Sequence, residues 1–250
     1  MSLNSSIPDD PHESASRFHT THWSVVVAAG QAGTVQSARA LEALCKAYWY
    51  PLYAYVRRRV TDIDQAQDLT QSFFAECLEK NSVGVADPRR GKFRAFLLTS
   101  LKHFLSKEWE KSRTLKRGGG RAALSLDFDR ADARYGMEPC SGLTAEQLFD
   151  RQWAVTLLEL IFERMESEFA RSGKAAQFQQ LKGFVVGDHA GATYAAAAAG
   201  LGISEAAAKM AAHRLRQRYR QLLREEIAHT VSSPEEVDDE IRNLFAVLDS

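Results

Sequence analysis

A short alanine-rich segment near the C-terminal end of the chain is followed by basic side chains at helical spacing. Residues 194–203 read YAAAAAGLGI, and Ser204 precedes the basic stretch. Lys209, His213 and Arg216 are three or four residues apart, so they share one face of a helix. A basic helix face of this kind can enter the major groove of DNA, with its first turns toward the base edges.

The spacing around this segment is that of a helix-turn-helix. Small side chains let two helices cross closely, Gly202 can adopt a turn conformation that other residues resist, and Ile203 is expected to fill the space between the helices. A solvated basic helix in an ordinary bundle is the alternative interpretation. The candidate DNA-binding residues of the motif are Ser204, Glu205, Lys209, His213, Arg214, Arg216 and Arg218.

A second candidate surface lies in residues 93–113, where aromatic and basic residues alternate. Aromatic rings can stack on unpaired bases while Lys and Arg hold the phosphate backbone. The alternative is that the aromatic residues form core, which we expect for Phe96 and Phe104, together with Leu101. The candidate residues for contact with a single strand are Arg94, Lys102, His103, Lys107, Trp109 and Arg113.

A third candidate surface is the predicted helix over residues 64–80. Asp68 and Gln71 are three residues apart and share a face of this helix. The face either docks a protein partner or is simply solvated, and spacing alone leaves both interpretations open.

The distribution of charge is uneven although the net charge is zero, with 32 basic and 32 acidic residues. Residues 86–121 contain eleven Lys and Arg against three acidic residues, and residues 204–224 contain six against one. In contrast, residues 122–170 contain ten acidic residues against four Arg, and residues 225–250 contain eight against one. Two basic stretches separated and followed by acidic ones predict two separate polyanion-binding surfaces.

Signatures of enzymes, metal sites and membrane spans are missing from the sequence. It contains no GxxxxGK[ST], GxSxG or HExxH pattern and no His pair with metal-ligand spacing, so we expect no enzyme activity, catalytic residue, cofactor or metal. Cys45, Cys77 and Cys140 form no CxxC pair, which favours reduced thiols and a cytoplasmic location. No apolar run approaches the ~20 residues that cross a bilayer, so we expect no membrane insertion.

The apolar periodicity predicts helices throughout and no strand ladder. Pro51 is expected to kink or divide the helix that begins near Ser37, and Asp62 or Asp64 to cap the next. The predicted fold is all-α, with two small helical bundles joined by a linker and a helix-turn-helix in the C-terminal bundle. Its divisions are a partly disordered N-terminal extension (1–33), a first helical domain (34–117), a linker with little helical period (118–143), a second domain (144–230) and an acidic C-terminal helix (231–250). We expect the C-terminal helix to pack within the chain.

Taken in order, these segments resemble bacterial RNA polymerase sigma factors of the extracytoplasmic-function class. The resemblance covers residues 41–221 and is carried by YPLY (50–53), DQAQDLTQSFF (64–74), FRAFL (93–97) and the helix-turn-helix with its His213-Arg214 pair. It implies that Asp68, Gln71 and Phe74 bind core polymerase. It also implies that the 93–113 helix holds the melted minus-ten element and that the helix-turn-helix reads the minus-thirty-five element. His103 stands where the family has Asn.

The function implied is a non-enzymatic subunit that recruits core RNA polymerase to promoter DNA and initiates transcription, and an anti-sigma partner is left open. Two alternatives stay open beside it. A stand-alone helix-turn-helix regulator would bind operators without polymerase, and a helical interaction protein would show no salt-dependent DNA binding.

Overall fold

The described part of the chain contains nine α-helices and no strand, which confirms the all-α prediction. The structure is a computed structural model that describes residues 35–79, 86, 91–114, 126–137, 142–185, 193–228, 230–231 and 233–249. The N-terminal extension expected over residues 1–33 lies outside them. The helices are α2 (Val35–Arg59), α3 (Ile63–Glu79), α4 (Phe93–Thr114), α5 (Phe128–Met137), α6 (Ala145–Arg171), α7 (Ala175–Leu181), α8 (Tyr194–Leu201), α9 (Glu205–Ala228) and α10 (Val237–Leu248), with short 3-10 turns at Lys182–Phe184 and Pro234–Glu236.

Local hydrogen bonds explain where several helices begin. The Asp62 carboxylate accepts a hydrogen bond from the Gln65 amide at 3.1 Å, so Asp62 caps α3. Thr144 and Gln147 form a reciprocal capping box at the start of α6. Pro51 lies inside α2, which continues as one helix through it, so of the two expected outcomes, a kink or a division, the division is wrong.

Helix α5 lies in the stretch where the sequence shows little helical period. The Asp127 carboxylate accepts a hydrogen bond from the Arg130 amide at 3.1 Å, which caps the helix. Phe128 is buried and packs edge-on against Tyr53, with the two ring centroids 5.4 Å apart. Asp132 accepts hydrogen bonds from the Tyr53 hydroxyl and the Arg57 guanidinium, each at 3.0 Å. These contacts fasten α5 to α2.

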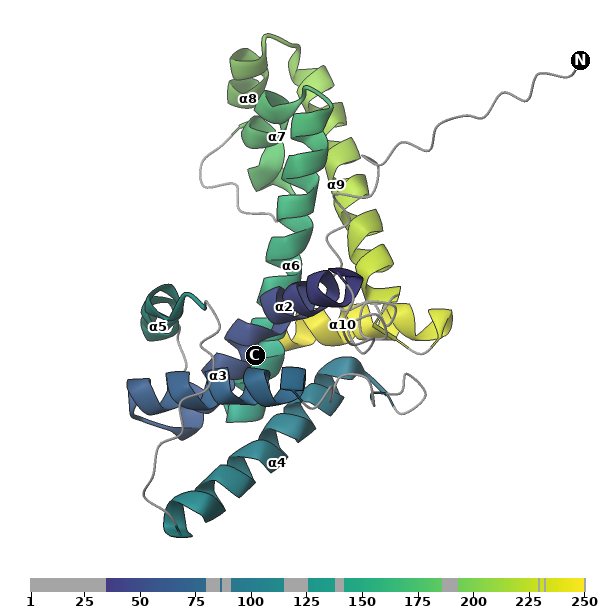
Figure 1. The fold of residues 1–250 in the computed structure, drawn as a ribbon. Helices are drawn as coiled ribbons and strands as arrows, with labels where there is room; N and C mark the ends of the chain where they lie inside the picture. Colours follow the sequence, from purple (N-terminus) through teal and green to yellow (C-terminus); the bar gives the residue numbers. More distant parts are fainter. Residues whose placement is uncertain are drawn as a thin grey trace, which may run out of the picture.

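Helices α6 and α9 run side by side from the end that carries α8 to the middle of the molecule (Figure 1). At one end α6 packs against α2, and toward the other end it packs against α7 (Figure 1). Buried side chains of α2–α5 and of α6–α10 belong to one continuous apolar cluster. The core therefore crosses the predicted division between residues 34–117 and 144–230.

The acidic C-terminal helix α10 packs against α6 and α9, which confirms that it packs within the chain. Val237 and Leu244 are its buried apolar residues. In the described ranges, no helix combines the length and the apolar character that crossing a membrane requires.

Candidate nucleic-acid interface

In the α8–α9 pair each helix begins with a side-chain cap, and a glycine makes the turn between them. The Thr193 hydroxyl accepts a hydrogen bond from the Ala196 amide at 3.1 Å and starts α8. Gly202 ends α8 in the left-handed conformation, with a φ of 64°, which a side chain would strain. The Ser204 hydroxyl accepts a hydrogen bond from the Ala207 amide at 3.2 Å and starts α9. Two helices therefore follow each other across a tight turn of fixed direction.

Alanine side chains form the contact between α8 and α9. Ala197 and Ala198 of α8 and Ala208 and Ala212 of α9 are all buried. Because these side chains are small, the two helices can approach closely. Ile203 is 39% exposed, so the expectation that it fills the space between the helices is wrong.

One face of α9 presents basic side chains to solvent. Lys209 and His213 are exposed on this face and Arg214 is exposed on a neighbouring face, whereas Ala208, Ala212 and Leu215 are buried. Arg216 is half-buried and continues the Lys209–His213 row toward the end of the helix. The basic side chains of this face therefore lie outside the core and are accessible from solvent.

Glu205 and Lys209 form an ion pair along the first turn of α9. The Lys209 ammonium lies 2.7 Å from the Glu205 carboxylate and 5.9 Å from the centre of the Tyr194 ring. The hydrogen bond that the Lys209 ammonium donates to the Glu205 carboxylate raises the pKa of Lys209, so the lysine stays charged. Lys209 is therefore held as a cation between Glu205 and the Tyr194 ring at the start of α8.

Arg218 belongs to the predicted motif but binds another helix of the same chain. Its guanidinium donates hydrogen bonds of 2.9 and 2.8 Å to the two carboxylate oxygens of Glu168 on α6. The Glu168 hydrogen bond raises the pKa of Arg218. Arg218 joins α9 to α6 in this conformation rather than facing a ligand.

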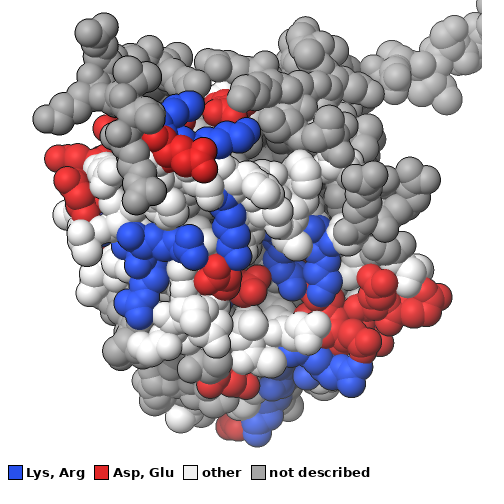
Figure 2. Space-filling view, turned by 90° about the horizontal axis from the view of Figure 1, so that it is seen from below, with Lys and Arg blue, Asp and Glu red and all other residues white. Residues whose placement is uncertain are grey.

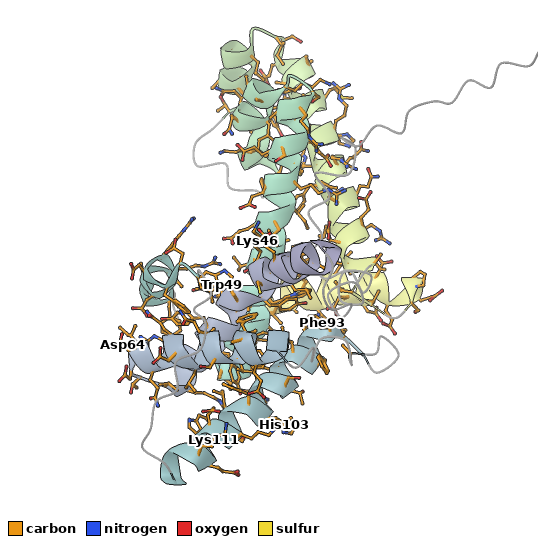
Figure 3. All side chains as sticks on the ribbon, viewed as in Figure 1. Lys46, Trp49, Asp64, Phe93, His103 and Lys111 are labelled. Carbon is orange, nitrogen blue, oxygen red and sulfur yellow. The ribbon has the colours of Figure 1, made fainter. Side chains whose placement is uncertain are left out.

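The predicted single-strand residues of α4 fall into two groups. His103 and Lys107 are exposed, and Trp109 is 37% exposed. Figure 3 shows His103 on the part of α4 that leads away from Phe93 at the helix start. These side chains form the open part of the α4 surface, and the Arg113 side chain lies outside the described residues.

Arg94 and Lys102 form the second group, in which each side chain pairs with carboxylates of other helices. The Arg94 side chain is 15% exposed, lies 3.4 Å from Asp150 of α6 and pairs with Glu240 of α10. Its guanidinium lies over the Trp153 ring, 4.3 Å from the ring centre. Burial lowers the pKa of Arg94 and raises the pKa of Asp150. Lys102 lies 2.8 Å from Glu146 at the start of α6.

The three residues expected to bind polymerase do not share one surface. Asp68 is exposed and Gln71 is half-buried on the same side of α3. Phe74 is 6% exposed and packs edge-on against Phe73, with ring centroids 5.9 Å apart. Phe74 is therefore core in this conformation, while Asp68 is accessible to a partner.

The carboxylates opposite the α4 surface were not among the predicted site residues. Glu146, Asp150 and Glu240 come from α6 and α10 and meet basic groups of α2 and α4. The sequence does contain a signal for such pairing, because acidic stretches follow each of the two basic stretches. The structure thus places an exposed basic face of α9 at one end of the molecule, and a partly masked basic face on α4 and an exposed acidic residue on α3 toward the other end (Figure 1). No protein-family model, no curated protein and no solved structure matches this chain.

Proposed function

We propose that this chain is a sigma factor of the extracytoplasmic-function class, which binds core RNA polymerase, recognises the minus-ten and minus-thirty-five promoter elements and initiates transcription. The observation that carries the proposal is the exposed basic face of α9 directly after the tight turn at Gly202. The protein acts as a non-enzymatic subunit in the cytoplasm, with polymerase and promoter DNA as its partners.

The α8–α9 pair is the duplex-binding part of the proposal, a helix-turn-helix. Glu205, Lys209 and His213 lie on the first turns of α9, where a recognition helix meets base edges. Arg214 and Arg216 lie further along the helix and are suited to phosphate contacts. Thr193 and Ser204 each accept one backbone N–H at the start of α8 and α9, and the exposed side chains of α9 supply the proposed contacts with DNA.

The exposed part of α4 is the single-strand-binding part. Trp109 offers an aromatic surface for a base, and Lys107 and His103 offer positive charge and hydrogen-bond donors nearby. Duplex and melted strand would thus meet different elements of the same chain, which promoter opening requires.

Transcription with purified components tests the proposal. Core RNA polymerase is combined with this protein and with DNA from upstream of its own coding sequence, and specific transcripts are measured. We expect transcripts that depend on the protein, and loss of them for Asp68→Arg, because reversing this exposed charge opposes docking of polymerase. Glu163→Arg, an equal charge change at an exposed position of α6, is the matched control.

Two outcomes would redirect the assignment. Tight operator binding without polymerase, together with no transcript, favours a stand-alone helix-turn-helix regulator. No salt-dependent DNA binding under any condition favours a helical interaction protein.

A further inference from the structure

The start of α4 is covered by a carboxylate from the other end of the chain. Glu240 of α10 is 1% exposed and accepts hydrogen bonds from the Lys92 ammonium and the Arg94 guanidinium. These basic groups precede and begin the helix that holds the candidate single-strand residues. One buried carboxylate therefore neutralises two cations of the α4 surface.

Helix α6 supplies further acidic groups to the same surface. Asp150 contacts Arg94 at 3.4 Å, and Glu146 contacts Lys102 at 2.8 Å. Figure 2 shows basic and acidic groups side by side on this end of the molecule rather than one continuous basic surface. A phosphate backbone approaching α4 would have to displace carboxylates that already occupy the cation positions.

Helix α10 is suited to leave this position. It has 12 residues, a length at which an isolated helix is marginal, so its order depends on packing against α6 and α9. Two apolar residues, Val237 and Leu244, and the Glu240 carboxylate are its buried side chains. In the chain it follows α9 and is adjacent to neither α4 nor α6, so its release does not require either of them to move along the backbone.

We propose that α10 is an acidic latch, in which Glu240 occupies Lys92 and Arg94 and thereby competes with single-stranded nucleic acid for the α4 surface. This inference rests on the proposed function, because it treats α4 as the strand-binding element. In the latched state the α4 surface binds a strand weakly, and a bound strand favours the state with α10 released. By linkage, loss of the Glu240 charge raises affinity for the strand.

Binding of a fluorescein-labelled single-stranded oligonucleotide to the full chain tests the latch by fluorescence anisotropy. Glu240→Gln removes the charge and keeps the side-chain volume. Asp239→Asn makes the same change on the neighbouring residue, which is exposed and pairs with Arg242 of the same helix. We expect Glu240→Gln to bind roughly fivefold tighter or more than wild type, and Asp239→Asn to bind as wild type does.

Hydrogen exchange on the wild-type protein provides a readout that needs no variant. Saturating oligonucleotide should accelerate amide exchange in α10 and leave exchange in α7 unchanged. The latch is overturned if Glu240→Gln binds no tighter than Asp239→Asn. For a Glu240→Gln protein that does not fold, unchanged exchange of α10 in the wild type overturns it.

The transcription experiment separates this inference from the function on which it rests. Tighter binding by Glu240→Gln without any polymerase-dependent transcript leaves the latch standing and removes the sigma-factor assignment. If wild type supports transcription but Glu240→Gln and Asp239→Asn bind the oligonucleotide equally, the sigma-factor assignment stands and the latch is overturned.

Discussion

Arg218 of α9 donates two hydrogen bonds to the Glu168 carboxylate of α6, one from Nε to Oε2 at 2.9 Å and one from Nη2 to Oε1 at 2.8 Å. Arg164 of α6 extends this network, because it lies 3.4 Å from Glu168 and 2.7 Å from Glu226. The basic residues of α9 therefore divide into two kinds. Arg218 holds the helix against its neighbour, whereas Lys209 and His213 face solvent.

Replacing Arg218 should affect stability, and replacing Arg214 should affect DNA binding. Arg218→Ala removes a two-pronged, partly buried contact and should lower the free energy of unfolding by about 1 kcal/mol. Arg214 is exposed, so Arg214→Ala should leave that free energy nearly unchanged and weaken duplex binding. Urea unfolding and a duplex titration measure the two effects. Equal stability of both variants would contradict the structural role of Arg218.

Helix starts could be predicted from sequence because the contacts that make them are local. Asp62, Thr144 and Ser204 each accept a hydrogen bond from an amide three residues ahead, and all three appear in the sequence as polar residues before apolar periods. Helix α5 was missed because its order depends on Phe128 packing against Tyr53, a residue far away in the chain.

The sequence also does not predict that carboxylates pair with the basic residues of α4, because these contacts join residues far apart in the chain. The spacing of Arg94 and Lys102 shows that they are basic and helical, but the carboxylates that pair with them come from α6 and α10. Likewise, the position of Phe74 on α3 does not reveal which face the core covers. Such contacts are set by how helices pack, and local periodicity carries little information about that.

The continuous core should make the helical part of the chain unfold as a unit. Phe149 of α6 is fully buried in the cluster that joins both halves. Phe149→Ala should lower the free energy of unfolding by about 3 to 5 kcal/mol, because it leaves a cavity in this core. Thermal unfolding by circular dichroism should show one transition, shifted down. Met210→Ala, at a position that is 57% exposed, is the control and should change stability little. Two separate transitions, of which only one responds to Phe149→Ala, would contradict a shared core.

Acid should weaken the contact between α6 and α4. The hydrogen bond from the Lys102 ammonium lowers the pKa of Glu146 below its ordinary value of 4.5. A carboxylate with a lowered pKa in the folded state stabilises the fold above its ordinary pKa, and this stabilisation is lost as the pH falls through the folded-state pKa. Wild type should therefore exceed Glu146→Gln in stability at about pH 7, and the difference should shrink below about pH 4. Urea unfolding of both proteins across this range measures it, and a difference that grows on acidification would contradict the assigned charge state.

The salt dependence of duplex binding gives a direct test of the α9 face. Lys209 lies beside Glu205 at 2.7 Å, and Lys46 of α2 has the same arrangement with Glu42 at 2.9 Å. Both lysine side chains are 56% exposed, so Lys46→Ala is a closely matched control for Lys209→Ala. If Lys209 contacts a phosphate, its loss removes one released counterion, and the slope of log K against log salt should fall in magnitude by about 1. Lys46→Ala should leave the slope unchanged, and an equal change for both variants would show that only net charge is being measured.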